Sequence, residues 1–392
     1  MISVEEALSL VLKLAPAPVP EEVTLRAALG RALLEPAVSR MTQPPFAASA
    51  MDGYAIRSAD VAQPLTVIGE SSAGHPFAGL CRPGAAVRIS TGAVVPGGCD
   101  RVVMQENIAR DGNIIVVTDS AGGTNIRVAG DDFRAGDRLD PGRRITPADI
   151  ALLAAMNVPT IIAARKPRVA ILAGGDELVR PGSTPAPGQI ISSNDLALAA
   201  MVEQAGAEAV VLPIAHDTRE SLRAGFAAAS EADLLVTIGG ASVGDHDLVG
   251  AVGRELGLDC TFHKIAMRPG KPLMAGRIKG VPMIGLPGNP VSAIVCGILF
   301  VRPLIRTMLG LPAVHRLSRA RLATDLGPEG NRQHYLRASL AEGVDLPTIQ
   351  AFSNQDSANL SILAKADALL VRPAGDPPRA AGEIVNYLPL AS

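Results

Sequence analysis

Residues suited to binding a phosphate and a divalent metal ion occur together in the stretch ADLLVTIGGASVGDHD, residues 232–247. An apolar, strand-like run gives way to glycines around Ser242, and then to two carboxylates, Asp245 and Asp247. A buried strand that opens through glycines into a helix is a common site for phosphate-bearing ligands, because backbone N–H groups can approach the anion closely. Carboxylates at the same turn are suitable ligands for Mg²⁺. We therefore predict a phosphate-and-metal site at this turn.

Two other acidic positions could belong to the same site. Glu177, in AGGDEL (173–178), follows two glycines after an apolar run and could bind Mg²⁺, bind a sugar hydroxyl or cap the next helix. Asp217 stands at capping-box spacing from Glu220, which favours a structural role at a helix start. Ligands bind at the carboxyl ends of strands in open α/β sheets, so we expect these loops to lie at that edge.

The loop GLPGNPVSA (285–293) is the third candidate. Asn289 is a good N-cap, the proline after it is a good first helical residue, and Gly288 allows a close backbone approach. Ser292 falls in the first helical turn, where an anion can be held. Because Pro-Gly-Asn-Pro punctuates many ordinary loops, this segment taken alone is better interpreted as a helix-capping turn.

A basic segment, KIAMRPGKP (264–272), lies in the chain between the turn that ends at Asp247 and the loop 285–293. Arg268 offers a planar fork and Lys271 a point charge, and both suit a multiply charged oxyanion. Charge alone predicts an ordinary solvated turn equally well. Its position between two glycine-rich loops favours anion binding.

Composition restricts the class of protein that carries these residues. A chain of 392 residues is too long for one core, and 48% hydrophobic residues are ample for several. A net charge of -2 and 3% aromatic residues argue against nucleic acid or an acidic membrane as the main partner. The acidic N-terminus lacks the features of a signal peptide, so we expect a soluble cytoplasmic protein. Four cysteines without a CxxC spacing predict isolated, reduced thiols.

The first part of the chain predicts helices interrupted by a β-rich insertion. Apolar periodicity predicts helices over 3–14 and about 25–34, and Thr146-Pro147 begins another that we expect to pack on them. Between them, short β-type runs separated by turns predict a small antiparallel β domain. We therefore expect a helical domain formed by 1–38 and 137–166, with residues 39–136 inserted as a β-rich domain.

The second part of the chain predicts two further domains. Uniformly apolar strands alternate with helices over 167–308, which indicates a three-layer α/β domain with a mainly parallel sheet. Helical patterns stop after Pro312, and five strand-like runs over 309–392 predict a small C-terminal β-barrel or sandwich. The fold class expected is thus multidomain, α/β and β.

Several motifs together resemble the molybdopterin molybdenumtransferase family, which includes bacterial MoeA and the E domain of gephyrin. They run in family order over nearly the whole chain, and the combination of MDGYA, TGAVVPGGCDRVVMQE and LPGNP is specific. The resemblance implies insertion of molybdate into adenylylated molybdopterin, with Mg²⁺ present and AMP released. It also implies a homodimer with its site at the subunit interface, and it makes 167–308 the molybdopterin-binding domain.

The same resemblance implies roles for individual residues. Catalytic roles fall to acidic residues and one threonine, and Mg²⁺ is assigned to Glu177 and Asp247. The catalytic set is Asp52, Thr91, Glu177, Asp217 and Asp247. The substrate-binding set is Ser242, Asp245, Arg268, Lys271, Gly288, Asn289, Ser292, Arg337 and Ser357. The pair Asp52 and Thr91 is expected to come from the second subunit.

Two other functions remain open on the sequence. Molybdopterin adenylyltransferases resemble the α/β domain alone, so the flanking domains argue against that activity. A non-catalytic scaffold that binds molybdopterin without turnover is the other alternative. AMP release from adenylylated molybdopterin is the observation that separates them.

Overall fold

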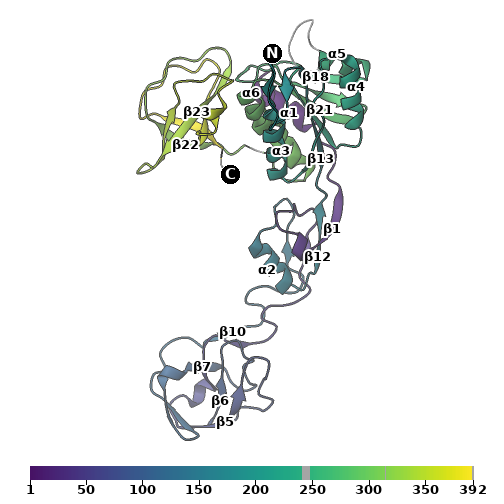
Figure 1. The fold of residues 1–392 in the computed structure, drawn as a ribbon. Helices are drawn as coiled ribbons and strands as arrows, with labels where there is room; N and C mark the ends of the chain where they lie inside the picture. The colour runs from purple at the N-terminus through teal and green to yellow at the C-terminus, as the bar shows by residue number, and fades with distance from the viewer. Residues whose placement is uncertain (241–247, 314, 391–392) are drawn as a thin grey trace.

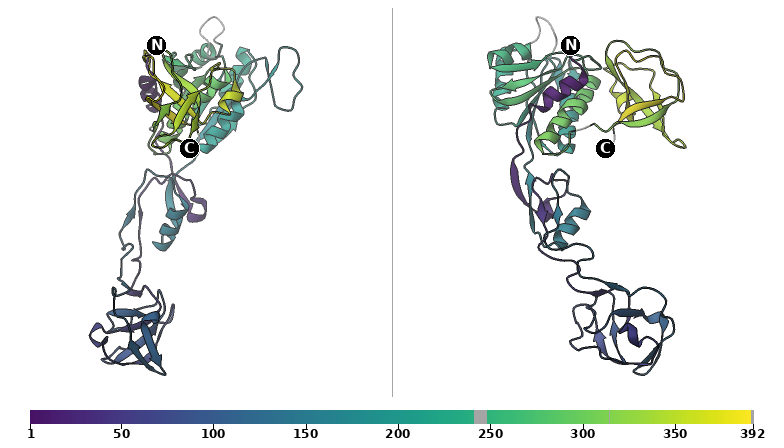
Figure 2. Two further views of the ribbon diagram at one scale, coloured as in Figure 1. Left: turned by 90° about the vertical axis from the view of Figure 1, so that its left-hand side faces the viewer. Right: turned by 180° about the vertical axis from the view of Figure 1, so that it is seen from behind.

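The computed structural model describes residues 1–240, 248–313 and 315–390. The molecule is elongated (Figures 1 and 2). An α/β domain and a C-terminal barrel lie side by side at one end, a β-rich domain lies at the other, and a narrow segment containing α2 (Pro147–Ala155) joins them. This arrangement places the predicted site residues of the β-rich domain far from those of the α/β domain within one chain.

A six-stranded sheet forms the centre of the α/β domain. Its first four strands pair in parallel and its last two pairings are antiparallel, which confirms the expected mainly parallel sheet. In sheet order the strands are β16 (Glu208–Val211), β13 (Arg168–Ala173), β17 (Leu234–Ile238), β21 (Val281–Leu286), β20 (Met274–Ile278) and β18 (Leu258–Phe262).

Helices cover both faces of this sheet because its strands are apolar on both sides. Along β13, Ile171 belongs to one core and Leu172 to the other. The first core contains α1 (Val4–Leu12), α3 (Asn194–Gln204) and the helical run from residue 290. The second contains α4 (Arg219–Ala228) and α5 (Leu248–Glu255). The predicted three-layer architecture is therefore confirmed.

The helical run from residue 290 consists of α6 (Pro290–Cys296), a π-helical turn η4 (Gly297–Val301) and α7 (Arg302–Met308). By length and composition it could cross a membrane, but 78% of its most apolar window is buried inside the protein. It packs in the core of the α/β domain, so its hydrophobicity has a structural explanation.

The C-terminal domain is a closed five-stranded barrel, confirming the expected β-barrel. Strand pairing runs β23–β24–β22–β26–β25, and β25 pairs again with β23. The short β19 (Met267–Arg268) of the basic segment adds to β23 in parallel, so it ties the barrel to the α/β domain. The strands are β22 (Ser318–Leu322), β23 (Gln333–Ala341), β24 (Thr348–Ala351), β25 (Ala368–Arg372) and β26 (Ile384–Pro389), and one short helix is α8 (Leu360–Leu363).

The β-rich domain contains a sheet that is mixed, so the expected antiparallel sheet is wrong in one pairing. Strands β5 and β6 are parallel, because the long 72–84 connection returns the chain to the same end. The order is β7 (Arg101–Met104), β4 (Gly53–Ile56), β6 (Ala85–Ile89), β5 (Leu65–Ser71), β9 (Ile114–Val117) and β8 (Ile108–Asp111). Shorter two-residue pairings join β3 (Ala48–Ser49) to β10 (Ile126–Arg127) and β2 (Ala37–Val38) to β11 (Arg138–Leu139).

The expected helical first domain is wrong. The predicted helix over 25–34 is one 3-10 turn, η1 (Leu25–Ala27), and the chain leaves it through Gly30 at a positive φ of 73°. Helix α1 buries Ala7 and Val11 in the core of the α/β domain instead of packing on α2. Helix α2 packs on the 23–33 segment, beside a ribbon formed by β1 (Pro20–Thr24) and β12 (Thr160–Ala164). The apolar stripe predicted the α1 helix but could not indicate its partner.

Candidate functional site

A cavity of about 1050 Å³ lies at the carboxyl ends of β13, β17 and β21. All three glycine-rich loops contribute to it, as the sequence predicted. Its polar lining includes Glu177, Asp217, Ser192, Ser193, Asn194 and Asn289, together with Gly174, Gly175, Gly239, Gly240 and Gly288. Leu178, Ile190, Ile191, Leu248 and Val249 form its apolar part. A ligand with both a charged group and an apolar ring system fits such a lining.

The backbones of the three loops touch one another at glycines. A Cβ on Gly239, whose φ is 81°, would lie 2.9 Å from the Gly174 carbonyl oxygen. Gly288 approaches from the other side, with its Cβ position 3.6 Å from the Gly239 Cα. Any side chain at Gly239 would force these loops apart, so the glycine fixes how closely the loops approach.

Glu177 folds back over Gly175 at the floor of this cavity. A Cβ on Gly175, whose φ is 148°, would lie 2.4 Å from a carboxylate oxygen of Glu177. The Leu178 amide donates to the Gly175 carbonyl at 3.2 Å, which closes the turn that carries Glu177. Because Gly175 has no side chain, the Glu177 carboxylate can occupy the space beside it.

Gly175→Ala is expected to displace the Glu177 carboxylate and lower turnover by roughly 10²-fold, because small misplacements at a reacting centre cost that much. Gly188→Ala is the matched control, since Gly188 also has a positive φ of 85° but has no neighbour within 4 Å of its Cβ position. Steady-state rates and melting temperatures of both variants provide the measurement. Equal losses of rate in the two would show that backbone strain, and not Glu177, is responsible.

Asp217 is not the helix cap that its spacing indicated. The N-cap of α4 is Thr218, whose hydroxyl accepts from the Ser221 amide at 3.2 Å. Asp176 instead accepts from the Asp217 amide at 3.2 Å and from Nδ1 of His216 at 3.0 Å. The cap moves one residue along because Thr218 has the extended conformation that a cap needs. The Asp217 carboxylate is thereby left for the cavity.

The LPGNP loop begins α6 as predicted, with Asn289 at the N-cap and the proline first in the helix. The Asn289 side chain makes no capping bond and donates instead to the Ser357 hydroxyl at 3.1 Å. The Val291 amide donates to the Ser357 carbonyl at 3.0 Å. These bonds attach the barrel's 353–359 segment to the edge of the cavity. Ser292 is buried and does not line it.

Asn194 was not predicted from the sequence. Its side-chain amide donates to the Gly288 carbonyl at 2.8 Å. It stands at the start of α3 on the cavity wall, next to Asp195, which is buried. Asp195 accepts from Ser192 at 2.9 Å and forms an ion pair with Arg180. The signal was available, because Ser-Ser-Asn-Asp is a helix-start sequence before an apolar stripe.

Arg337, on β23, is fully buried, yet its Nε and Nη1 have no hydrogen-bond partner among residues 1–240, 248–313 and 315–390. Its Nη2 donates to the Asp356 carbonyl at 2.9 Å, one residue before Ser357. Burial lowers the pKa of the guanidinium, the neighbouring Asp356 opposes this shift, and Arg268 adds to it. Buried charged donors without partners are rare and costly, so two of them together indicate a place for an anion.

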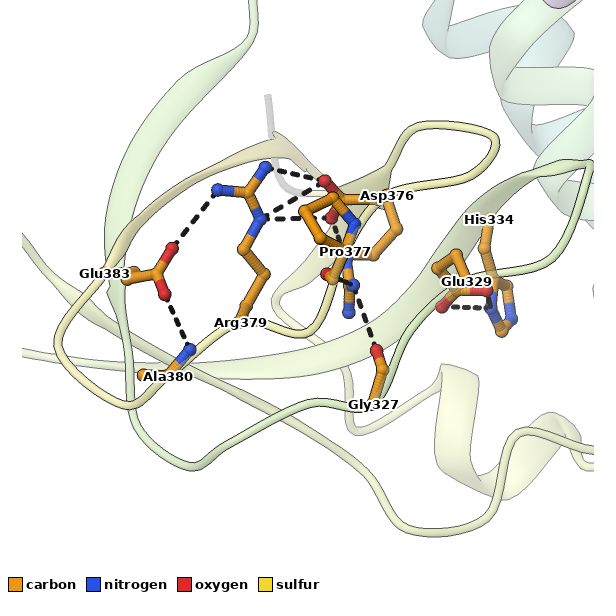
Figure 3. Close-up of polar contacts among 9 residues, drawn as sticks. Gly327, Glu329, His334, Asp376, Pro377, Arg379, Ala380 and Glu383 are labelled. Atoms are coloured by element: carbon orange, nitrogen blue, oxygen red, sulfur yellow. Dashed lines mark hydrogen bonds and ion pairs between the residues drawn. The ribbon is translucent and has the colours of Figure 1, made fainter.

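Arg268 is exposed on the rim of a second cavity, of about 820 Å³, at the mouth of the barrel. Its strand neighbour His334 lies in the same cavity and contacts the Glu329 carboxylate through Nδ1 at 3.1 Å (Figure 3). Burial lowers the pKa of His334, and the neighbouring Glu329 carboxylate raises it. The positive charges of Arg268 and Arg337 lower it further. Lys271 is exposed and lines neither cavity.

Asp52 and Thr91 lie in the distant β-rich domain and contact each other. The Thr91 amide donates to Asp52 Oδ1 at 2.6 Å and its hydroxyl to the same oxygen at 2.9 Å. The backbone bond, then the hydroxyl, holds the pKa of Asp52 below its usual range, so it is a carboxylate at neutral pH. Three predicted residues, Ser242, Asp245 and Asp247, lie outside the described residues.

Three family descriptions together match most of the chain. Residues 2–157 match the "MoeA N-terminal region (domain I and II)". Residues 170–307 match a "probable molybdopterin binding domain", and residues 319–390 match the "MoeA C-terminal region (domain IV)". The cavity described above is formed mainly by the second of these regions.

Individual relatives agree with these regions. A molybdopterin molybdenumtransferase of Nostoc sp. is 38% identical over 387 residues, covering 94% of this chain and 88% of the relative. A Haemophilus influenzae protein of the same name is 38% identical over 79% of this chain and 78% of its own. A crystal structure of a molybdopterin biosynthesis MoeA protein from Pyrococcus horikoshii superposes with a TM-score of 0.85 at 31% identity, covering all of both chains.

Proposed function

Because the chain belongs to the molybdopterin molybdenumtransferase family, we propose that it transfers molybdenum from molybdate to adenylylated molybdopterin, with Mg²⁺ required and AMP released. The enzyme is a transferase of molybdenum cofactor biosynthesis. One observation carries the detailed proposal: a glycine-rich cavity lined by carboxylates is connected, through the Asn289–Ser357 bond, to the segment that the buried Arg337 contacts. Two nitrogens of this arginine have no hydrogen-bond partner among the described residues. The cavity suits a pyrophosphate and the arginine suits a tetrahedral dianion.

The pyrophosphate of the substrate is proposed to bind where Gly174, Gly239 and Gly288 meet. Glycines there allow backbone N–H groups to approach phosphate oxygens, and the start of α6 adds the positive end of a helix. The apolar residues of the cavity, among them Ile190 and Leu248, are proposed to contact the ring system. The phosphate-binding glycines would therefore lie between the adenylyl group and the pterin.

Mg²⁺ fits the carboxylates of this cavity. Glu177 and Asp217 both line it, and Mg²⁺ commonly uses one or two protein carboxylates together with substrate phosphates. Within residues 1–240, 248–313 and 315–390 no group of three or more His, Cys, Asp or Glu residues could hold a metal alone. When bound, the ion would neutralise charge on the phosphoanhydride as AMP departs. Asp247 is proposed as a further ligand from the sequence.

Molybdate is proposed to bind against Arg337, with Arg268 at the entrance and Ser357 beside it. Arginine suits such an anion because its fork can donate two parallel hydrogen bonds. The Asn289–Ser357 bond joins this anion site to the phosphate floor, so both substrates can be held at one junction of two domains. The dithiolene sulfurs of the substrate would then bind molybdenum at the place where AMP leaves.

Asp52 and Thr91 are proposed to complete the site from the second subunit of a homodimer. Within one chain, the β-rich domain that carries them lies at the opposite end of the molecule from the α/β domain (Figures 1 and 2). Their mutual hydrogen bonds hold a carboxylate at the surface of the β-rich domain. A partner chain is the available means of bringing that carboxylate to a cavity.

A direct assay separates this function from the two alternatives. Purified protein is given adenylylated molybdopterin, molybdate and Mg²⁺, and AMP is followed; a parallel reaction contains molybdopterin and ATP. Insertion predicts AMP release in the first reaction and none in the second. Transfer of adenylate from ATP to molybdopterin would instead identify an adenylyltransferase. Tight binding of the adenylylated substrate without AMP release would identify a scaffold.

A further inference from the structure

Cys81 and Cys99 of the β-rich domain are neighbours in the fold, although the sequence predicted isolated thiols. The Cys81 amide donates to the Gly97 carbonyl at 2.9 Å. The Cys99 amide donates to the Pro96 carbonyl at 3.1 Å, which folds 96–99 into a turn. At Gly98 a Cβ would lie 2.5 Å from the Cys81 carbonyl oxygen. The backbone at Cys81 thus lies against the turn that ends in Cys99.

The two side chains share one small apolar cluster. Cys81 is buried with Ala85 and Val87, and the half-buried Cys99 packs against them. The Cys81 thiol contacts the Ala85 carbonyl at 3.3 Å. Burial, with a further contribution from the neighbouring Cys81, raises the pKa of the Cys99 thiol, so this thiol is protonated at neutral pH. Both cysteine side chains therefore belong to the same apolar cluster.

The other two cysteines lie in a different domain. Cys260 is exposed on β18, and Cys296 is buried in α6. Both belong to the α/β domain, far from the β-rich domain (Figure 1). The fold therefore selects one pair out of four cysteines.

We propose that Cys81 and Cys99 form a reversible intramolecular disulfide when the protein meets hydrogen peroxide. Cys99, the more accessible thiol, attacks one peroxide oxygen and becomes a sulfenic acid, and one water leaves. The Cys81 sulfur then attacks the Cys99 sulfur, the S–O bond breaks and a second water leaves. The thiols lose two electrons and two protons, and one peroxide is reduced to two waters. A dithiol reductant reverses the change.

The disulfide would enclose β6 and Thr91 within one covalent loop. Closing a loop of this length restricts the unfolded chain and raises thermal stability, provided the native geometry is kept. Because the pKa of Cys99 is raised, little thiolate is present at neutral pH, and the reaction should proceed faster as the pH rises. The modification would thus strengthen the domain that holds Asp52 and Thr91 together.

The test uses full-length protein with Cys260→Ser, which removes the exposed thiol that could join two chains. After exposure to hydrogen peroxide, free thiols are alkylated and the peptides are identified by mass spectrometry. We expect a linkage between positions 81 and 99, loss of two titratable thiols, a higher melting temperature and full reversal by dithiothreitol. Adding Cys81→Ser should abolish the linkage and leave a sulfenic acid at Cys99 that dimedone traps.

Two results would overturn the proposal. One is that both thiols stay free, or that Cys99 proceeds to sulfinic acid without a linkage, under peroxide exposure that oxidises the methionines. The other is a disulfide that involves Cys296, which would show that local unfolding and not native proximity selects the pair.

Discussion

Arg337→Met is expected to lower molybdate-dependent turnover by about 10²-fold or more while leaving the protein at least as stable as before. The two effects have one cause. Arg337 is fully buried, and its Nε and Nη1 have no hydrogen-bond partner in the part of the chain that the structure describes. In the absence of an anion the folded protein therefore buries a charge that the neighbouring Asp356 offsets only in part. Methionine fills similar space without that charge, which removes a destabilising group. We therefore expect Arg337 to lower the stability of the folded protein while it provides the site for the anion.

The measurement for Arg337→Met is a pair of values, the rate against molybdate concentration and the free energy of unfolding. Arg337→Lys is a useful companion, because it keeps a charge but loses the fork, and it should bind molybdate more weakly than the wild type. Arg321→Met is the matched control, since Arg321 is half-exposed and bonds Asp345 at 2.6 Å. A large loss of stability in Arg337→Met would contradict the anion-site assignment and make this arginine structural.

Asp376→Ala is expected to destabilise the C-terminal barrel by about 3–5 kcal/mol, because it leaves a buried guanidinium without its carboxylate. Arg372 is 1% exposed, and its Nε forms an ion pair with Asp376. Arg379 donates to the other oxygen of Asp376 at 2.6 Å and also reaches Glu383 at 3.2 Å (Figure 3). Without Asp376, the partners that Arg372 keeps among the described residues are the Gly327 and Pro377 carbonyls.

The same ion pair gives the barrel a definite dependence on pH. Hydrogen bonds from Arg379, with a further contribution from Arg372, hold the pKa of Asp376 below its ordinary value of 3.8. A lowered carboxylate pKa adds stability above that ordinary value, and this stability is lost as the pH falls through the folded-state pKa. Wild-type unfolding free energy should therefore decline below pH 3.8, and Asp376→Ala should show less of this decline.

Chemical denaturation at neutral and acidic pH measures both effects of Asp376→Ala. Asp345→Ala is the control, because Asp345 forms an exposed pair with Arg321, and the loss of a solvent-exposed pair should change stability little. Equal losses of unfolding free energy in Asp376→Ala and Asp345→Ala would show that the burial of Arg372 does not determine the cost of removing its carboxylate partner. The two buried arginines differ in their partners: Arg372 forms an ion pair with the buried Asp376, whereas the Nε and Nη1 of Arg337 have no hydrogen-bond partner among the described residues.

The sequence predicted that the three glycine-rich loops meet at one edge of the sheet, because the signals for this are local. Strands β13, β17 and β21 are continuous apolar runs, and each ends in glycines. Parallel strands place those ends at one edge, so proximity of the loops followed from periodicity and topology. The start of α6 at Asn289-Pro290 was also correct, since capping depends on neighbouring residues alone.

What the sequence could not supply depends on partners distant in the chain. The stripe of α1 does not reveal that it packs on α7 in place of α2, and spacing did not show that Thr218 rather than Asp217 caps α4. Likewise, HYLRA and LLVRP each present an arginine on a strand. Only the fold shows that Arg372 forms an ion pair with Asp376, whereas two nitrogens of Arg337 have no hydrogen-bond partner in the described part of the chain. The Cys81–Cys99 contact depends on a turn that no spacing rule describes.

The most direct test of the proposed reaction is the ratio of AMP released to molybdenum bound in the product. Purified protein is incubated with adenylylated molybdopterin, molybdate and Mg²⁺, and both quantities are measured over time in the same samples. Coupled insertion predicts equal amounts of AMP and inserted molybdenum, with both lost when a chelator removes Mg²⁺ or when Glu177 is replaced by Gln. AMP released without molybdenum, or molybdenum inserted without AMP, would contradict it.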